Sequence, residues 1–333
     1  MKTSIFVILF VVVLAYFQPA MAEQPPLTIA TGWGAMDGTV SIAREKGFFK
    51  EQGIKAEVSS MTRSTWALKA YLQGKADVTT VNSLNIVRSN LDPSDHAIIG
   101  TLCYSDNQLK LLARKSAGIN KVSDLKGKKI AVHQASFAHF YLEKFLLFNG
   151  LALDDVEEVF ASKKEIPGVI ERGLAHATMQ HGVPIAKTKK ILGDDHVIFQ
   201  NPAVHRKTQH LMVSRKWLTR HQEEAKGVLR ALLKGEEFIK VHTEEGIEIL
   251  ANARKYDIRD MARTVRHEMH YNLSLEQSLF TELESMEQWA LDNTLVKRNT
   301  PRNYLEMVDY SLLEEIDPKR VTIIRPLAYK RNE

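Results

Sequence analysis

Residues 124–159 read DLKGKKIAVHQASFAHFYLEKFLLFNGLALDDVEEV and show the architecture of the chain most clearly. Ile130 to Val132 form a short apolar run after two lysines, which is typical of a buried parallel strand. From Phe137 onward, aromatic residues recur every three or four positions, which predicts a helix. Asn149-Gly150 ends it because both residues accept a left-handed conformation. A second extended segment follows from Val156 to Phe160. We therefore expect strand, loop, helix and strand, the unit from which α/β sheets are built.

Ser136 stands at the start of this helix, where its side-chain oxygen can cap a backbone N–H group. The first turn of a helix carries free N–H donors and about half a positive charge, and such an end attracts anions and polar ligand groups. The alternative is an ordinary capped helix with nothing bound. The local pattern leaves both interpretations open.

The first 22 residues have the pattern of a secretory signal peptide. Lys2 precedes an apolar run from Ile5 to Phe17, and small residues follow at Ala20 and Ala22. The run is shorter than the roughly 20 apolar residues that span a bilayer. We expect cleavage after Ala22. Because no cysteine follows for lipid attachment, we expect the mature protein to be released as a soluble exported chain; an uncleaved signal anchor is the alternative.

Length and composition favour two lobes and exclude nucleic-acid binding. The chain has 333 residues, more than one compact core usually holds, and 44% of them are hydrophobic. The formal net charge of +5 is spread out, and the densest basic run, Lys187 to Lys190, has no aromatic residue to stack on bases. Cys103 is the only cysteine, so it makes no internal disulfide, and we expect it to be buried as a small apolar group.

A glycine-rich loop, Thr31 to Gly38, follows the first expected strand, Leu27 to Ala30. It leads into a helix from about Thr39 to Lys46 and a strand from Lys55 to Ser59, which together form a parallel strand-helix-strand unit. The loop sequence GWGAMDG lacks the G-x-G-x-x-G fingerprint, because Asp37 stands where its last glycine should be. We therefore expect no nucleotide and no other cofactor.

Polar residues also follow the other expected strands. Ser64 or Thr65 would cap a helix that continues to Leu72, with Arg63 beside its start. The residues Asn82 to Asn85 form a loop after a strand over 77–81. Two extended runs, 97–102 and 109–113, are separated by a polar kink and indicate a crossing from one lobe to another; residues 210–214 would carry the chain back.

From Lys216 onward the pattern predicts helices that cover the first lobe. They are expected at Trp217 to His221, Glu224 to His242, Thr243 to Lys255, Asp260 to Met269, Leu275 to Asp292 and Tyr304 to Ile316, with a last strand or tail at Val321 to Ile324.

Four segments in this order resemble the periplasmic substrate-binding proteins of ABC transporters, in the branch that serves nitrate, sulfonates, taurine and thiamine-pyrimidine precursors. The segments are AREKGFFKEQGIKAEV, ALKAYLQGKADV, DLKGKKIAV with its following serine loop, and NYLEMVDYSLLEEIDPKRVTII. The resemblance covers nearly the whole chain after the signal peptide. The chain departs from the family pattern at His176, where many members have Asp, and at Gly182-Val183, where they often have an aromatic residue.

The resemblance implies an α/β fold of periplasmic binding protein type II, with mixed, mainly parallel sheets in two lobes joined by a two-strand hinge. Residues 1–22 would be the signal peptide, 23–105 the first part of lobe 1, 106–206 lobe 2, and 207–333 the second part of lobe 1. Every loop after a strand would then point into one cleft between the lobes.

The residues expected to bind the ligand come from both walls of that cleft and from the hinge. They are Trp33, Met36, Thr39, Arg63, Ser64, Thr65, Asn82, Ser83, Tyr104, Ser136, Phe137, His139, Gln180 and His181.

The function implied is capture of a small organic or inorganic anion of the alkanesulfonate, taurine or nitrate type, because Asp37 is the only acid near the expected site. The alternatives are a thiamine pyrimidine precursor as ligand, or a sensor that docks on a membrane receptor. The resemblance implies a monomer whose partner is an ABC permease in the inner membrane.

An enzyme is not expected. His267-Glu268-Met269-His270 has its histidines three apart, whereas a zinc hydrolase motif needs them four apart, and no Gly-x-Ser-x-Gly elbow is present. We therefore expect neither a catalytic residue nor a metal ligand.

Overall fold

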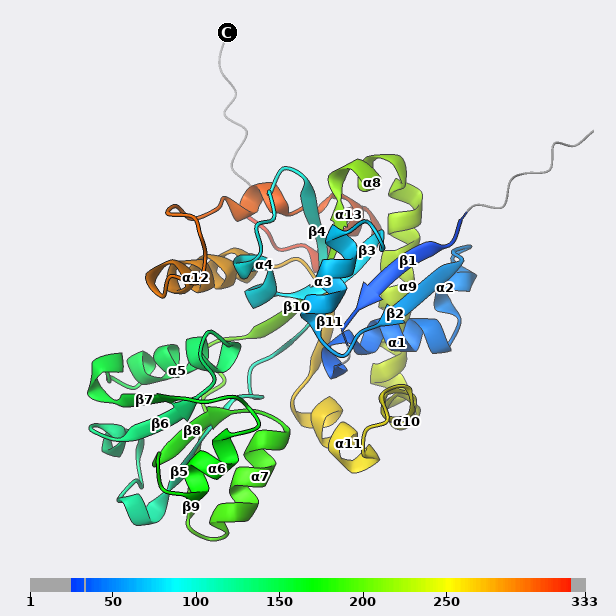
Figure 1. The fold of residues 1–333 in the computed structure, drawn as a ribbon. Coiled ribbons are helices and arrows are strands. Elements are labelled where there is room, and N and C mark those ends of the chain that lie inside the picture. The colour runs from blue at the N-terminus through cyan, green and yellow to red at the C-terminus, as the bar shows by residue number, and fades with distance from the viewer. Residues whose placement is uncertain (1–24, 33, 325–333) are drawn as a thin grey trace, which may run out of the picture.

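The computed structural model describes residues 25–32 and 34–324 (Figure 1). The predicted signal peptide and Trp33 lie outside these ranges. The described residues form two β-sheets, each with helices packed on both faces, and we call the part built on the six-stranded sheet lobe 1 and the part built on the five-stranded sheet lobe 2. The predicted α/β class with two mixed sheets is confirmed.

The sheet of lobe 1 has the order β11-β4-β10-β3-β1-β2, in which β1 runs parallel to β2 and β3, while β10 and β11 are antiparallel to their neighbours. Its strands are β1 (Leu27–Thr31), β2 (Ala56–Ser60), β3 (Val78–Asn82), β4 (His96–Ser105), β10 (Lys207–Ser214) and β11 (His270–Ser274).

The sheet of lobe 2 has the order β7-β6-β8-β5-β9, in which β6 is parallel to β7 and β8, and β5 is antiparallel to both of its neighbours. Its strands are β5 (Lys110–Arg114), β6 (Lys129–Val132), β7 (Glu157–Phe160), β8 (Ala177–Gln180) and β9 (His196–Phe199). The chain therefore passes between the lobes twice, from β4 to β5 and from β9 to β10.

Helices cover both sheets. Those of lobe 1 are α1 (Gly38–Glu45), α2 (Phe48–Glu51), α3 (Ser64–Leu72), α4 (Ser83–Arg88), α8 (Arg215–Arg220), α9 (Gln222–Val241), α10 (Thr243–Arg254), α11 (Ile258–His267), α12 (Ser278–Asp292) and α13 (Ser311–Ile316). Those of lobe 2 are α5 (Phe137–Phe148), α6 (Ile166–Glu171) and α7 (Val183–Leu192). In the described part of the chain, no helix is both long enough and apolar enough to span a membrane.

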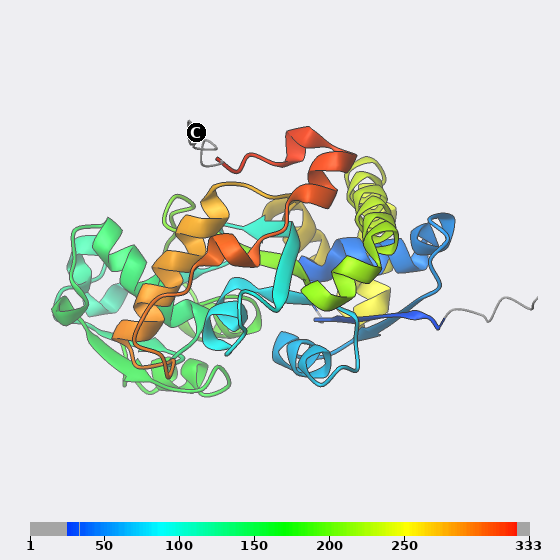
Figure 2. The ribbon, with the colours of Figure 1, turned by 90° about the horizontal axis from the view of Figure 1, so that it is seen from above.

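The lobes touch through helices α5 and α12, which lie side by side in both views (Figures 1 and 2). The ring of Phe140 in α5 packs edge-on against Trp289 in α12, with ring centroids 5.4 Å apart, and Phe140 belongs to the main apolar core of lobe 1. The Trp289 indole also donates a hydrogen bond of 2.6 Å to Glu143 of α5. One side of the junction between the lobes is thus packed like a protein interior.

Three predicted elements differ in the structure. Residues 83–88 form helix α4 instead of a loop, because Asn82 caps its first turn by accepting the Asn85 N–H at 3.0 Å. Strand β11, whose alternating Tyr271 and Leu273 are buried, lies between the helices predicted over 260–269 and 275–292 and was not predicted. The helix predicted over 304–316 is a short 3-10 turn, Tyr304–Met307, followed by α13.

Two details of the helix ends also need correction. The N-cap of α3 is Arg63, with no side-chain cap, so neither Ser64 nor Thr65 caps this helix. His267 ends α11 whereas His270 begins β11, so the two histidines lie on different elements.

Candidate functional site

The loop after β1 is held by a buried network around Asp37. One Asp37 carboxylate oxygen accepts hydrogen bonds from the Thr80 hydroxyl at 2.5 Å and from the Gln209 amide at 2.8 Å. Gly32 packs against the same carboxylate so closely that a Cβ there would lie 2.8 Å from its other oxygen, so only glycine fits. The loop is therefore fixed to β3 and β10 at the end of lobe 1 that faces lobe 2.

Arg254 fastens this loop to the helices that cover lobe 1. Its buried guanidinium donates to the Gly32 carbonyl at 3.3 Å and to the Ser41 hydroxyl at 2.6 Å. Burial lowers the pKa of Arg254, and the nearby charge of Asp37 opposes this effect. A residue far along the chain thus sets the position of a loop near its start.

Two of the residues expected on the lobe 1 wall, Ser64 and Asn82, lie together. The Ser64 hydroxyl oxygen accepts hydrogen bonds from the side-chain amides of Asn82 at 3.0 Å and Asn85 at 2.9 Å. Arg63 and Thr65 are exposed beside them, and the Arg63 guanidinium lies 5.5 Å from the Trp66 ring centroid.

Three other residues expected on this wall are buried inside lobe 1. Met36 packs with Cys103 in an apolar cluster, and Thr39 is 1% exposed. Ser83 is hydrogen-bonded to Thr208 and lies 3.3 Å from His210. In this conformation none of the three presents a free polar group at the lobe surface.

On the lobe 2 wall, Ser136 caps α5 as expected. Its hydroxyl oxygen accepts the His139 N–H at 3.3 Å and its O–H donates to the His133 carbonyl at 2.6 Å. Ala135, just before it, has a φ of 54°, a strained value for a residue with a side chain. Arg88 of lobe 1 donates to the Ala135 carbonyl at 2.9 Å, so this loop touches the opposite lobe.

His139 lies in the packed contact between the lobes. Its Nε2 atom is 2.9 Å from Glu158, its Nδ1 accepts the Ala135 N–H, and its ring packs edge-on against Trp289. Phe137 faces the returning crossing, where its ring packs against His205 and lies 6.0 Å from the Lys207 ammonium. Of the two, Phe137 is the one beside the hinge.

Three basic side chains gather near the hinge, and none has an ion-pair partner in residues 25–32 and 34–324. Lys207 begins β10, His181 follows β8, and Lys163 follows β7. Burial lowers the pKa of Lys207 to about 8, and the charge of Lys163 adds to that effect. Burial, and then the charges of Lys207 and Lys163, lower the pKa of His181 well below its usual value, so it is neutral at pH 7.

Unsatisfied polar atoms surround the same region. Gln180 is 0% exposed, and neither atom of its side-chain amide has a hydrogen-bond partner in the described structure. The Ser105 hydroxyl, in the residue paired with Lys207, is likewise buried without a partner. Buried polar groups usually are hydrogen-bonded, so these two side chains have hydrogen-bonding capacity that a polar ligand or water could use.

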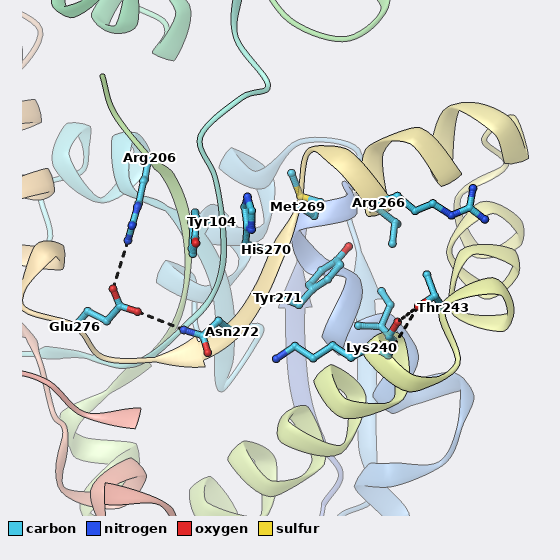
Figure 3. Close-up of a pocket in the computed structure, with 12 residues that line it drawn as sticks. Tyr104, Arg206, Lys240, Thr243, Arg266, Met269, His270, Tyr271, Asn272 and Glu276 are labelled. Atoms are coloured by element: carbon cyan, nitrogen blue, oxygen red, sulfur yellow. Dashed lines mark hydrogen bonds and ion pairs between the residues drawn. The ribbon is translucent and has the colours of Figure 1, made fainter. Parts of the chain in front are cut away.

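A separate pocket of about 670 Å³ lies along the outer edge of β11, between α9 and α11 (Figure 3). Tyr104, expected near the hinge, lines this pocket; its ring stacks on His270 at 4.5 Å and the Arg206 guanidinium lies over its other face at 4.5 Å. The basic groups here already have acidic neighbours: Arg206 has Glu276, Lys240 has Glu236, Arg266 has Glu244 and His270 has Asp106.

Two α/β lobes connected by two crossings, with polar loops at their facing ends, define the periplasmic binding protein type II fold. A family model described as NMT1/THI5 like matches residues 38–246, which is more than half of the chain. The chain therefore belongs to the NMT1/THI5-like family.

Individual relatives are more distant. A provisionally named binding protein of Brucella abortus is 27% identical over 143 residues, which is 42% of this chain and 43% of that protein, so the match spans less than half of the relative's length. The periplasmic aliphatic sulphonate binding protein SsuA from Escherichia coli has a TM-score of 0.70 at 15% identity, over 83% of this chain and 95% of its own.

An enzyme shares the same fold. The desulfurization enzyme DSZB has a TM-score of 0.63 at 13% identity, over 89% of this chain and all of its own. The fold alone therefore does not separate binding from catalysis, and the residues of the site have to decide.

Sequence reasoning missed Lys163, Lys207 and Gln209. Lys163 follows β7 and Lys207 begins β10, and a position at the end of a strand is a detectable signal, whereas Gln209 lies inside β10 and carries no such signal. The lack of acidic partners around the two lysines, however, becomes visible only once the strands are assembled.

Proposed function

We propose that the protein is the solute-binding component of an ABC importer and that it captures a small anion, of the alkanesulfonate, taurine or nitrate type, between its two lobes. The observation that carries the proposal is the group of basic side chains without acidic partners at the hinge. Membership of the NMT1/THI5-like family and the likeness to sulfonate-binding SsuA support the transport role.

The protein acts after export. Its first 22 residues direct it to the periplasm, cleavage follows Ala22, and the mature monomer delivers its ligand to a permease in the inner membrane. The expected signal sequence and the fold support this location together. A ligand that bridges both lobes would favour the closed form, which is the form a permease can recognise.

The state of Cys103, the only cysteine of the sequence, is consistent with binding without catalysis. The Cys103 side chain is fully buried and its S–H donates to the Met36 carbonyl at 3.1 Å. Burial, and then the charge of Asp37, raise the pKa of the Cys103 thiol well above its usual value, so the nucleophilic thiolate does not form at neutral pH.

A thiamine pyrimidine precursor is the second candidate ligand, because Phe137 offers an aromatic face beside the hinge. A pyrimidine also needs an acid partner, and Asp37 already accepts hydrogen bonds from Thr80 and Gln209. The anion is therefore the better supported ligand. A sensor that docks on a membrane receptor would use the same binding site with a different partner.

A thermal-shift panel with taurine, ethanesulfonate, nitrate and an aminopyrimidine tests this function. A sulfonate or nitrate should raise the melting temperature with concentration, since a ligand at 100 times its Kd adds about 2.7 kcal/mol to stability. Mass spectrometry should recover the same compound unchanged. A response to the pyrimidine alone supports the second candidate, whereas turnover of the ligand or no response to any compound contradicts the proposal.

A further inference from the structure

The lysine at the start of β10 carries a charge that the described protein leaves without a counterion. The Lys207 side chain is half-buried, and its ammonium group donates one hydrogen bond of 3.3 Å, to the neutral Gln108 amide oxygen. Desolvating a charge is unfavourable unless an opposite charge compensates it. A half-buried lysine of this kind is therefore explained either by a function that uses its charge or by an anionic partner that the described residues do not supply.

Both acidic groups that act on Lys207 are already engaged. Asp37 accepts hydrogen bonds from Thr80 and Gln209, and Glu268 lies 3.8 Å from the Lys110 ammonium. Lys163 adds positive charge from the loop after β7 and keeps part of its side chain exposed. With Lys207, Lys163 and Lys110 against Asp37 and Glu268, the local charge is positive, so an anion from outside the chain would be attracted there.

Lys207 also lies where the two lobes meet. It belongs to the strand that re-enters lobe 1, pairs with Ser105 of the outgoing crossing, and lies 6.0 Å from the Phe137 ring of lobe 2. An anion beside its ammonium would touch both crossings and the start of α5. The unpartnered Ser105 hydroxyl lies on the adjoining strand as a further donor.

Strand β8 of lobe 2 supplies neutral donors. His181 carries no charge at pH 7, so it can donate one ring N–H without adding a second buried cation. Gln180, directly before it, has a fully buried amide with both atoms unpartnered. One half-buried charge from lobe 1 and these uncharged donors suit a singly charged oxyanion, and the charge of the exposed Lys163 of lobe 2 adds to the attraction.

We infer that Lys207 is the specificity-determining residue of the interlobe site: it neutralises the charged group of a singly charged oxyanion, sulfonate or nitrate, while His181 and Gln180 hydrogen-bond its oxygens. This inference rests on the proposed function and adds to it the residue that selects the ligand by charge. In this proposal Lys207, and not Arg63 at the exposed N-cap of α3, is the charge-selecting group.

The test compares three lysine variants of the mature protein by calorimetric titration with the sulfonate or nitrate that raises the melting temperature most. Lys207→Met should weaken binding at least 100-fold, and Lys207→Gln should weaken it similarly, because both remove the charge. Lys164→Met removes an exposed charge beside Lys163 and should change affinity less than threefold. Without ligand, Lys207→Met should melt at the same or a higher temperature than the parent, because it removes an uncompensated charge.

The outcomes separate this inference from the proposed function. If no panel compound binds the parent protein, the proposed function fails before the variants are compared. If an anion binds the parent and Lys207→Met with equal affinity, the function stands and the inference is overturned. If both Lys207 variants fail to fold, Lys207 has a structural role and the inference is likewise overturned.

Discussion

The charge of Lys207 is less compensated than that of Lys226. Lys226, for comparison, lies 2.6 Å from Glu223 and 2.8 Å from Glu315, and its pKa is raised because both carboxylates accept hydrogen bonds from it. The pKa of Lys207 moves the opposite way, to about 8, mainly through burial. The surroundings therefore lower the pKa of Lys207 and raise the pKa of Lys226.

This tuning predicts that anion binding depends on pH. Lys207 loses its proton as pH rises through about 8, and only the protonated form attracts an anion, so affinity should fall up to about tenfold per pH unit above that value. The other groups acting on Lys207 are Lys163, Cys103, Asp37 and Glu268. Titrations at pH 7, 8, 9 and 9.5 check this.

The control for that series is Lys207→Met, in which the remaining weak binding should be nearly independent of pH. His181 does not contribute in this range, because its pKa is well below its usual value of 6.5. Affinity in the parent protein that stays constant up to pH 9.5 would exclude Lys207 as the group that holds the anion.

The residues of the site could be predicted only in part, since a sequence shows residue types but not which charges find partners. Ser64 and Asn82 were expected in one wall and do lie together. Ser83 stands next to Asn82, yet its side chain faces the buried hydroxyl of Thr208. Neighbouring residues point in different directions, and a motif of polar residues does not say which one reaches the ligand.

At the scale of single elements, helix α5 depends on its cap. Replacing Ser136 by alanine removes the acceptor of the His139 N–H and should lower the free energy of unfolding by about 1 kcal/mol. Urea denaturation measures the loss. Ser60→Ala is the matched control, because Ser60 is exposed at the end of β2, and it should stay within about 0.5 kcal/mol of the parent.

Ser136→Ala also separates two roles of this residue. If Ser136 only caps α5, anion affinity should stay close to that of the parent once the protein is folded. If its hydroxyl or the helix end also contacts the ligand, affinity falls as well. Equal stability of Ser136→Ala and Ser60→Ala would contradict the capping role.

Most elements could be predicted from periodicity, and the exceptions have physical reasons. Buried parallel strands such as β6 are short apolar runs, which sequence identifies well. His270 begins β11 three residues after His267, the last residue of α11. This spacing is also typical of a helix, so it concealed the strand-like alternation of Tyr271 and Leu273. Helix α4 has only six residues, and its cap, Asn82, is also a common turn residue.

At the scale of the whole molecule, the lobes are joined unequally on their two sides. On one side α5 packs on α12 through Phe140 and Trp289, and the Arg88 guanidinium binds the Ala135 carbonyl. At the hinge the contacts involve polar groups that lack partners, Gln180 among them. A ligand bound beside the crossings would supply the missing contacts and favour the closed arrangement of the lobes.

The position of bound ligand tests the central claim most directly. A crystal structure of the protein grown with the anion that raises its melting temperature should show one molecule between the lobes, with its charged group beside the Lys207 ammonium and its oxygens within hydrogen-bond distance of His181 or Gln180. An anion that binds only in the pocket at the edge of β11, or that contacts a single lobe, would contradict the account.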